Sequence, residues 1–337
     1  MTSRRPHPLC LLLLVVVGAG VACIKLDFFL FAGEPASLDD YDFESEDLDG
    51  IEPARIHMDM VEVGDSGQEI HVIFVERDLA KLERWVTEFH LNPAPDFDEL
   101  AARNLTIVYS QGNRGNMLLY WHRIAYLEDM GFNVVAFDYR GRGASDGETS
   151  ERSTYADVQR AYDWAVAQVG SDAAIISYSF SMGGGPGLFL CSPDSERAIA
   201  ACITESAFSS TEQLIQESTD FAVEGSWFLD VEYPNAERAG RLEMPYMMMH
   251  GELDQRVSVA NAYLIWENAR DRHALNRIFI VPEAAHRDYP VPSYGPNELP
   301  TEYSYPDEMP LELQRELREI YQPRIAQFIV EVLAELE

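Results

Sequence analysis

The chain has 337 residues, of which 47% are hydrophobic, enough for the core of one large α/β domain or two smaller ones. It carries 57 acidic and 25 basic residues, which gives a formal net charge of −32 at pH 7. A surface of this charge repels nucleic acid and anionic membrane, so neither is expected to bind it directly.

The amino end has the pattern of a targeting segment. Arg4 and Arg5 precede an uncharged apolar stretch over residues 9–22, which is short for a membrane span of ~20 residues and typical of a secretory signal. Small residues before Cys23 resemble a bacterial lipoprotein signal, in which the cysteine is acylated. Residues 1–23 are therefore predicted to be a signal segment lipidated at Cys23, which exports the protein and anchors it to a membrane of the cell envelope. Cleavage to a soluble exported protein and an uncleaved anchor are the alternatives, because Gly20 stands where such signals usually have leucine.

An acidic segment follows. No basic residue occurs from Leu26 to Ala54, while carboxylates crowd together between Asp39 and Glu52. This composition predicts a tether over residues 24–54 rather than part of a core. The apolar run 28–31 is an exception that could dock on the membrane or on the domain.

The remaining residues, 55–337, predict one catalytic domain in which strands alternate with helices. Alternating apolar residues on both sides of the turn 64–67 predict a hairpin, and apolar positions from Leu79 to Phe89 predict a helix. Further strands are predicted over residues 105–109, 134–137, 173–177, 199–204, 244–251 and 277–281, with helices over 155–169 and 258–269. Pro323 is expected to kink or split a terminal helix over 311–336. This order predicts a doubly wound, mostly parallel sheet.

Ser181 lies in the most informative run of the chain, residues 175–185. A strand-like apolar approach ends in a serine flanked by small residues, and a helix start follows, which is the layout of a nucleophile elbow. The positions two before and two after the serine must be small; here they are Ser179 and Gly183, where the usual pattern has glycine at both. A Gly/Ser-rich connection between strand and helix is the alternative interpretation of this run alone.

Two residues further along the chain complete a possible catalytic set. A serine hydroxyl needs a base to take its proton, and the base needs an orienting carboxylate. Asp254 follows the predicted strand 244–251, and His286 follows the predicted strand 277–281. Both therefore fall at the carboxyl ends of strands, where open α/β sheets place their ligands. The order serine, acid, histidine predicts Ser181 as nucleophile, Asp254 as acid and His286 as base.

The chain resembles the α/β-hydrolase superfamily, and within it the serine hydrolases related to membrane-associated α/β-hydrolase-domain proteins and serine aminopeptidase-like hydrolases. The likeness lies in five blocks: residues 110–116, 138–147, the elbow, 244–254 and 282–286. It implies an α/β-hydrolase fold with a small cap insertion at about 206–242. It also implies that the acid is the third residue after the strand-ending Gly251, which is Asp254 rather than Glu252.

The resemblance further implies an oxyanion hole made by the backbone N–H groups of Asn113 and Met182. The family's histidine in this loop is Gln111 here, a change that leaves backbone donors intact. The block 138–147 is predicted to be a structural loop near the site, with Asp138 and Arg140 paired or capping backbone groups.

The predicted function is a cell-envelope serine hydrolase that cleaves carboxylic esters or thioesters through an acyl-enzyme, with a small-molecule or lipid-like ester as substrate. No cofactor or metal is implied, because the histidines are scattered and no His/Cys cluster has ligand spacing. Cys191 and Cys202 are expected as buried free thiols rather than a disulfide. The aromatic residues of the cap and the segment 287–310 could wall the substrate pocket. A peptidase or amidase with the same triad, and a non-catalytic binding or scaffold lipoprotein of the same fold, are the alternatives.

Overall fold

The computed structural model describes residues 30–31, 33–41, 43, 48–65, 67–218, 231–282, 284–286 and 311–336. The predicted signal segment with Cys23 lies outside these residues, as do part of the predicted cap and the proline-rich segment after the histidine. No helix in the described part of the chain combines the length and apolarity needed to cross a membrane.

An eight-stranded sheet forms the centre of the molecule, in the order β1-β2-β4-β3-β5-β6-β7-β8. The hairpin of β1 and β2 is antiparallel and pairs antiparallel with β4, and all strand pairs from β4 to β8 are parallel. The strands are β1 (Ile56–Glu62), β2 (Glu69–Val75), β3 (Thr106–Ser110), β4 (Asn133–Phe137), β5 (Ile175–Phe180), β6 (Ala201–Glu205), β7 (Tyr246–Gly251) and β8 (Arg277–Val281). The predicted doubly wound, mostly parallel sheet is confirmed.

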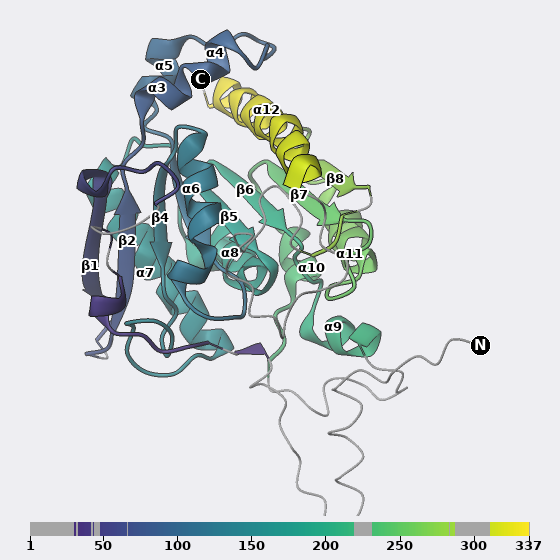
Figure 1. Cartoon of the computed structure of the whole chain (residues 1–337). Coiled ribbons are helices and arrows are strands. Elements are labelled where there is room, and N and C mark those ends of the chain that lie inside the picture. Colours follow the sequence, from purple (N-terminus) through teal and green to yellow (C-terminus); the bar gives the residue numbers. More distant parts are fainter. Residues whose placement is uncertain are drawn as a thin grey trace, which may run out of the picture.

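Helices cover both faces of the sheet, as Figure 1 shows. Successive strand residues point to opposite faces, so that in β4 Val134 and Ala136 enter one core and Val135 and Phe137 the other. The first core is closed by α6 (Trp121–Asp129) and α12 (Leu311–Glu335). The second is closed by α7 (Glu151–Val169), α8 (Gly184–Cys191), α10 (Asn235–Ala239) and α11 (Val259–Ala269). Cys191 and Cys202 are buried free thiols in this second core, as predicted.

Two helix predictions need correction. The expected single helix over 79–89 is two short helices, α3 (Leu79–Leu82) and α4 (Arg84–Thr87), followed by α5 (Phe97–Ala102). Of the two outcomes expected at Pro323, a kink or a split, the structure contradicts the split, because α12 continues through the proline. Its apolar side chains after Pro323, including Ile325 and Ile329, are buried in the first core, and this packing outweighs the local cost of the proline.

The prediction of a tether over residues 24–54 is wrong for the described residues of this segment. Tyr41, Phe43 and Ile51 are buried in the first core, and Leu30 is buried in the second. Residues 33–41, which we call the N-terminal strap, also pair with the domain through the bonds Ala36 N to Gly143 O and Gly143 N to Glu34 O, both 2.8 Å. Composition was misleading because the aromatic side chains of Tyr41 and Phe43 are buried, while the described carboxylates around them, Asp39, Asp40, Asp49 and Glu52, are exposed.

Candidate active site

Ser181, Asp254 and His286 come together at one edge of the sheet. Ser181 follows β5, Asp254 follows β7, and His286 follows β8. The three strands are parallel neighbours with only β6 between β5 and β7, so their carboxyl ends open at the same edge. All three side chains are largely buried: Ser181 is 8% exposed, Asp254 6% and His286 7%.

The turn at Ser181 has the geometry that the small residues around it predicted. Ser181 has a φ of 53°, a left-handed conformation that is uncommon for serine and lifts its side chain out of the strand direction. A Cβ on Gly183 would lie 2.1 Å from the carbonyl oxygen of Ser110, so only glycine fits there. The turn is therefore pressed against the end of β3, where the predicted oxyanion loop begins.

Ser179 points away from this turn. Its side chain is fully buried, and its Oγ donates a hydrogen bond to the carbonyl oxygen of Ile203 at 3.4 Å. Gly187 of α8 makes room for it, since a Cβ there would lie 2.7 Å from Ser179 Oγ. A serine is thus accommodated two residues before Ser181 because the helix that follows lacks a side chain at the contact.

A continuous hydrogen-bond chain joins the three side chains. His286 Nε2 lies 3.0 Å from Ser181 Oγ, and His286 Nδ1 lies 2.7 Å from Asp254 Oδ2. An ionised carboxylate can only accept hydrogen bonds, so Nδ1 carries the ring proton and Nε2 is left to accept the hydroxyl proton of Ser181. The backbone carbonyl of His286 also accepts a hydrogen bond from Ser206 Oγ at 3.2 Å, which fixes the loop that carries the imidazole.

Asp254 is held as a carboxylate. Its Oδ1 accepts the backbone N–H groups of Arg256 and Val257, both at 2.9 Å. Burial alone would raise its pKa, but the charge of His286 and the hydrogen bonds from His250 and His286 outweigh burial, and the pKa lies below its ordinary value. Glu252 in the same loop has an exposed side chain, so it is not the carboxylate that meets His286.

The loop after β3 carries Asn113, the first predicted oxyanion donor, and the elbow carries Met182, the second. Asn113 is half-buried and Met182 is buried. The carboxylate of Asp138 holds this loop in place. It accepts hydrogen bonds from the Gln111 side chain at 3.1 Å and from the Met117 N–H at 2.7 Å, and it also accepts one from the hydroxyl of Tyr41 in the N-terminal strap. Gln111 therefore ties the loop to the sheet at the position where the family has histidine.

Another buried group beneath the site, Glu205 at the end of β6, escaped the sequence analysis. Burial raises its pKa to about 7, although it pairs with Arg123 and accepts a hydrogen bond from Tyr178. The guanidinium of Arg123 stacks 3.8 Å from the ring centroid of Phe180, whose ring lies 5.2 Å from that of His286. The Arg123–Glu205 pair thus supports the Phe180 ring, which packs beside the imidazole of His286. No local sequence pattern marks this pair.

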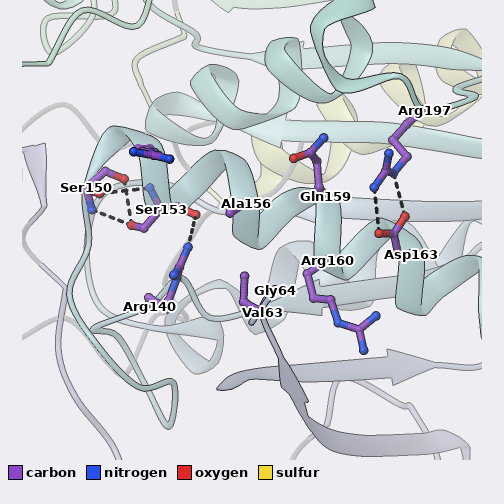
Figure 2. A pocket seen from close by; sticks show the side chains of 11 residues that line it. Val63, Gly64, Arg140, Ser150, Ser153, Ala156, Gln159, Arg160, Asp163 and Arg197 are labelled. Carbon is purple, nitrogen blue, oxygen red and sulfur yellow. Dashed lines mark hydrogen bonds and ion pairs between the residues drawn. The ribbon is translucent and has the colours of Figure 1, made fainter. Parts of the chain in front are cut away.

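A cavity of about 530 Å³ lies along α7, away from these residues. Figure 2 shows Arg197 facing Asp163 at one end and Arg140 at the other. The charges of these two arginines are paired: Arg197 bonds Asp163 at 2.7 and 2.9 Å, and Arg140 bonds Asp157 at 2.6 Å. The predicted pairing in the block 138–147 is therefore with α7, and the cavity takes no part in the candidate site.

The predicted pocket aromatics fall into two groups. Phe208 and Tyr233 are buried against each other with ring centroids 5.9 Å apart, so they form core beside the site. Phe221, Trp227, Phe228 and the segment 287–310 lie outside the described residues. Within the described ranges, no cluster of three or more His, Cys, Asp or Glu side chains could hold a metal ion.

Comparison with known proteins gives a consistent family likeness. The sequence model of a family described as the α/β hydrolase fold matches residues 106–224, which include Ser181. The uncharacterized protein YfhR of Escherichia coli is 28% identical over 222 residues, covering 64% of this chain and 73% of YfhR. The α/β hydrolase domain-containing protein aho-3 of Caenorhabditis elegans is 27% identical over 190 residues, covering 55% of this chain and 53% of aho-3.

Solved structures show the same architecture. An esterase of Pyrococcus furiosus aligns with a TM-score of 0.58 at 13% identity, covering 89% of this chain and 99% of the esterase. An α/β hydrolase of Vibrio vulnificus aligns with a TM-score of 0.51 at 13% identity, covering 68% of this chain and 73% of that protein. At this level of identity the likeness concerns the fold.

Proposed function

Because the chain belongs to the α/β-hydrolase superfamily, we propose that it is a serine hydrolase that cleaves carboxylic esters or thioesters through an acyl-enzyme. The observation that carries this proposal is the hydrogen-bond chain from Ser181 Oγ through His286 to Asp254, with distances of 3.0 and 2.7 Å. Within the fold, this is the arrangement that turns a weakly nucleophilic hydroxyl into an attacking group.

In the first half-reaction, Ser181 Oγ forms a bond to the acyl carbon while its proton passes to His286 Nε2. The carbonyl oxygen gains the negative charge, and the backbone N–H groups of Asn113 and Met182 are the donors assigned to it. When the bond to the leaving oxygen or sulfur breaks, Nε2 returns the proton to the departing alcohol or thiol. Water then repeats the sequence at the acyl-enzyme and releases the carboxylic acid.

Asp254 stays ionised throughout. It holds the imidazole by Nδ1 and stabilises the imidazolium that forms when Nε2 is protonated. The two backbone N–H groups on its other oxygen keep the carboxylate from rotating away from His286.

Rapid mixing with p-nitrophenyl esters of increasing acyl length tests the proposal. The expected result is a burst of about one p-nitrophenolate per chain, followed by slower turnover, because acylation precedes a separate hydrolysis step. Matched p-nitroanilides and thioesters are assayed beside them. Turnover of anilides at a kcat/KM equal to that of the esters would make the protein an amidase, and the absence of turnover on every class would favour a binding protein.

We also propose that the protein is exported and anchored in the cell envelope through Cys23. Support comes from Arg4 and Arg5, the apolar stretch 9–22 and the small residues before Cys23. The wild-type protein should partition into the detergent phase, whereas Cys23→Ala should lose both processing at that position and the lipid mass. A mature N-terminus elsewhere, without lipid on Cys23, would contradict lipidation.

A further inference from the structure

Arg142 is a buried arginine that contacts Met182 and the peptide unit that carries the Asn113 N–H. Its side chain is 0% exposed. One guanidinium nitrogen, Nη1, donates to the carbonyl oxygen of Gly112 at 2.9 Å, and the other, Nη2, donates to Met182 Sδ at 3.4 Å. Arg142 lies in the block 138–147, which the sequence predicts to be a structural loop.

The contact with Gly112 bears on the N–H of Asn113 through covalent geometry. The carbonyl of Gly112 and the N–H of Asn113 belong to one planar peptide unit, in which the C=O and N–H bonds of a trans peptide point in opposite directions. A guanidinium that fixes the carbonyl therefore also fixes the direction of the N–H. A charge-assisted hydrogen bond to the carbonyl also polarises the unit and makes the N–H a stronger donor.

The buried carboxylate of Asp138 acts on the charge of Arg142 only at a distance. Among the residues that the structure describes, Arg142 forms no ion pair, and its Nε has no hydrogen-bond partner. Its guanidinium carbon lies 5.2 Å from the ring centroid of Tyr139, a contact that stabilises a cation without neutralising it. A buried positive charge beside the loop favours negative charge developing nearby, because the low dielectric of the interior screens it poorly.

The N-terminal strap covers this arginine. Gly33 lies directly on the side chain, since a Cβ there would be 2.3 Å from Arg142 Cγ and 2.7 Å from Cδ. The strap continues with bridges between Gly33 and Gly115 and between Pro35 and Gly143. The strap therefore packs against the side chain of Arg142 and contributes to the burial of this arginine.

We propose that Arg142 is a positioning residue that orients and polarises the Asn113 N–H for the oxyanion, and that the N-terminal strap keeps it in place. This inference rests on the proposed function, because it needs an oxyanion formed at Ser181. It adds that the segment between the expected anchor and the domain is required for full activity.

The test replaces Arg142 by methionine and by lysine in the full chain. In Arg142→Met we expect kcat for a p-nitrophenyl ester to fall about 100-fold, the size of effect seen when one oxyanion donor is lost, with KM within about threefold of wild type. The affinity for an aryl boronic acid, which forms a tetrahedral anion on Ser181 Oγ, should fall by a similar factor. Arg142→Lys keeps the charge but not the two contacts, so its loss should be intermediate.

Arg77→Met is the matched control. Arg77 is half-buried, and like Arg142 it donates to a backbone carbonyl (Ala101 O, 2.7 Å) and forms no ion pair in the described part of the chain. It lies at the opposite edge of the sheet from the candidate site. We expect this variant to lose thermal stability while kcat and boronic acid affinity stay within threefold of wild type. A purely structural role for Arg142 would give the same pattern in both variants.

Gly33→Val tests the strap, because its side chain must displace Arg142 while the guanidinium remains. We expect kcat and the affinity for the boronic acid to fall by the same factors as in Arg142→Met. If Arg142→Met does not fold, Gly33→Val and Arg142→Lys test the role of Arg142 in its place. Wild-type kcat and boronic acid affinity in the folded Arg142 variants would overturn the inference. Wild-type turnover by Ser181→Ala, or no boronic acid binding to the wild-type protein, would instead overturn the proposed function.

Discussion

Replacing Ser181 by alanine should lower kcat for an ester substrate by on the order of 10⁶, because the hydroxyl that His286 Nε2 faces at 3.0 Å is then gone. The acyl-enzyme burst should disappear, and a fluorophosphonate probe should no longer label the protein. Labelling of the wild-type chain followed by peptide mapping should place the adduct on Ser181.

Ser179→Ala is the control for this experiment, since Ser179 lies only two residues away. Its Oγ faces Ile203 O rather than His286, so the variant should keep kcat within about tenfold of wild type. An adduct mapped to Ser179, or a Ser181→Ala variant that still shows a burst, would overturn the assignment of the nucleophile.

Asp254→Asn should lower kcat by on the order of 10⁴ with little change in KM. The asparagine keeps the volume of the side chain but removes the charge that stabilises the imidazolium. If its NH₂ group faces His286 Nδ1, two donors meet, and the ring shifts to the tautomer in which Nε2 carries the proton and can no longer accept one from Ser181.

Glu252→Gln is the matched control, because it makes the same chemical change in the same loop on an exposed side chain. It should cost less than about tenfold in kcat. An Asp254→Asn variant with near wild-type kcat beside a Glu252→Gln variant that has lost activity would show that the acid is Glu252, whatever the fate of the other two residues.

The pH dependence of the wild-type enzyme follows from the state of Asp254. Its pKa lies below the ordinary value, so the carboxylate stays ionised as the pH falls through the neutral and mildly acidic range. The loss of kcat/KM on acidification should therefore come from protonation of the imidazole, which then cannot accept the proton of Ser181. The contribution of the Asp254 carboxylate to folding stability is present above the ordinary carboxyl pKa. It is lost only as the pH falls through the lowered pKa of Asp254.

The sheet and the positions of the three candidate residues could be predicted from the sequence alone. The spacing of apolar residues and the runs of β-branched residues are local properties of the sequence. They located all eight strands to within a few residues. The small residues around Ser181 are also a local steric requirement, since the sharp turn admits no larger side chain at Gly183. Because parallel strands open at one edge, the order of Ser181, Asp254 and His286 was enough to predict that they meet.

The packing of distant segments against one another could not be predicted in this way. The acidic composition of residues 24–54 predicted a tether, but Tyr41 is buried against Asp138, 97 residues away. The roles of Ser179, Glu205 and Arg142 likewise depend on contacts with other elements: Ile203 O, the Arg123 guanidinium and Gly112 O. Burial and pairing of this kind arise from the order of strands and the packing of the chain over them, and a local pattern of residue types does not encode them.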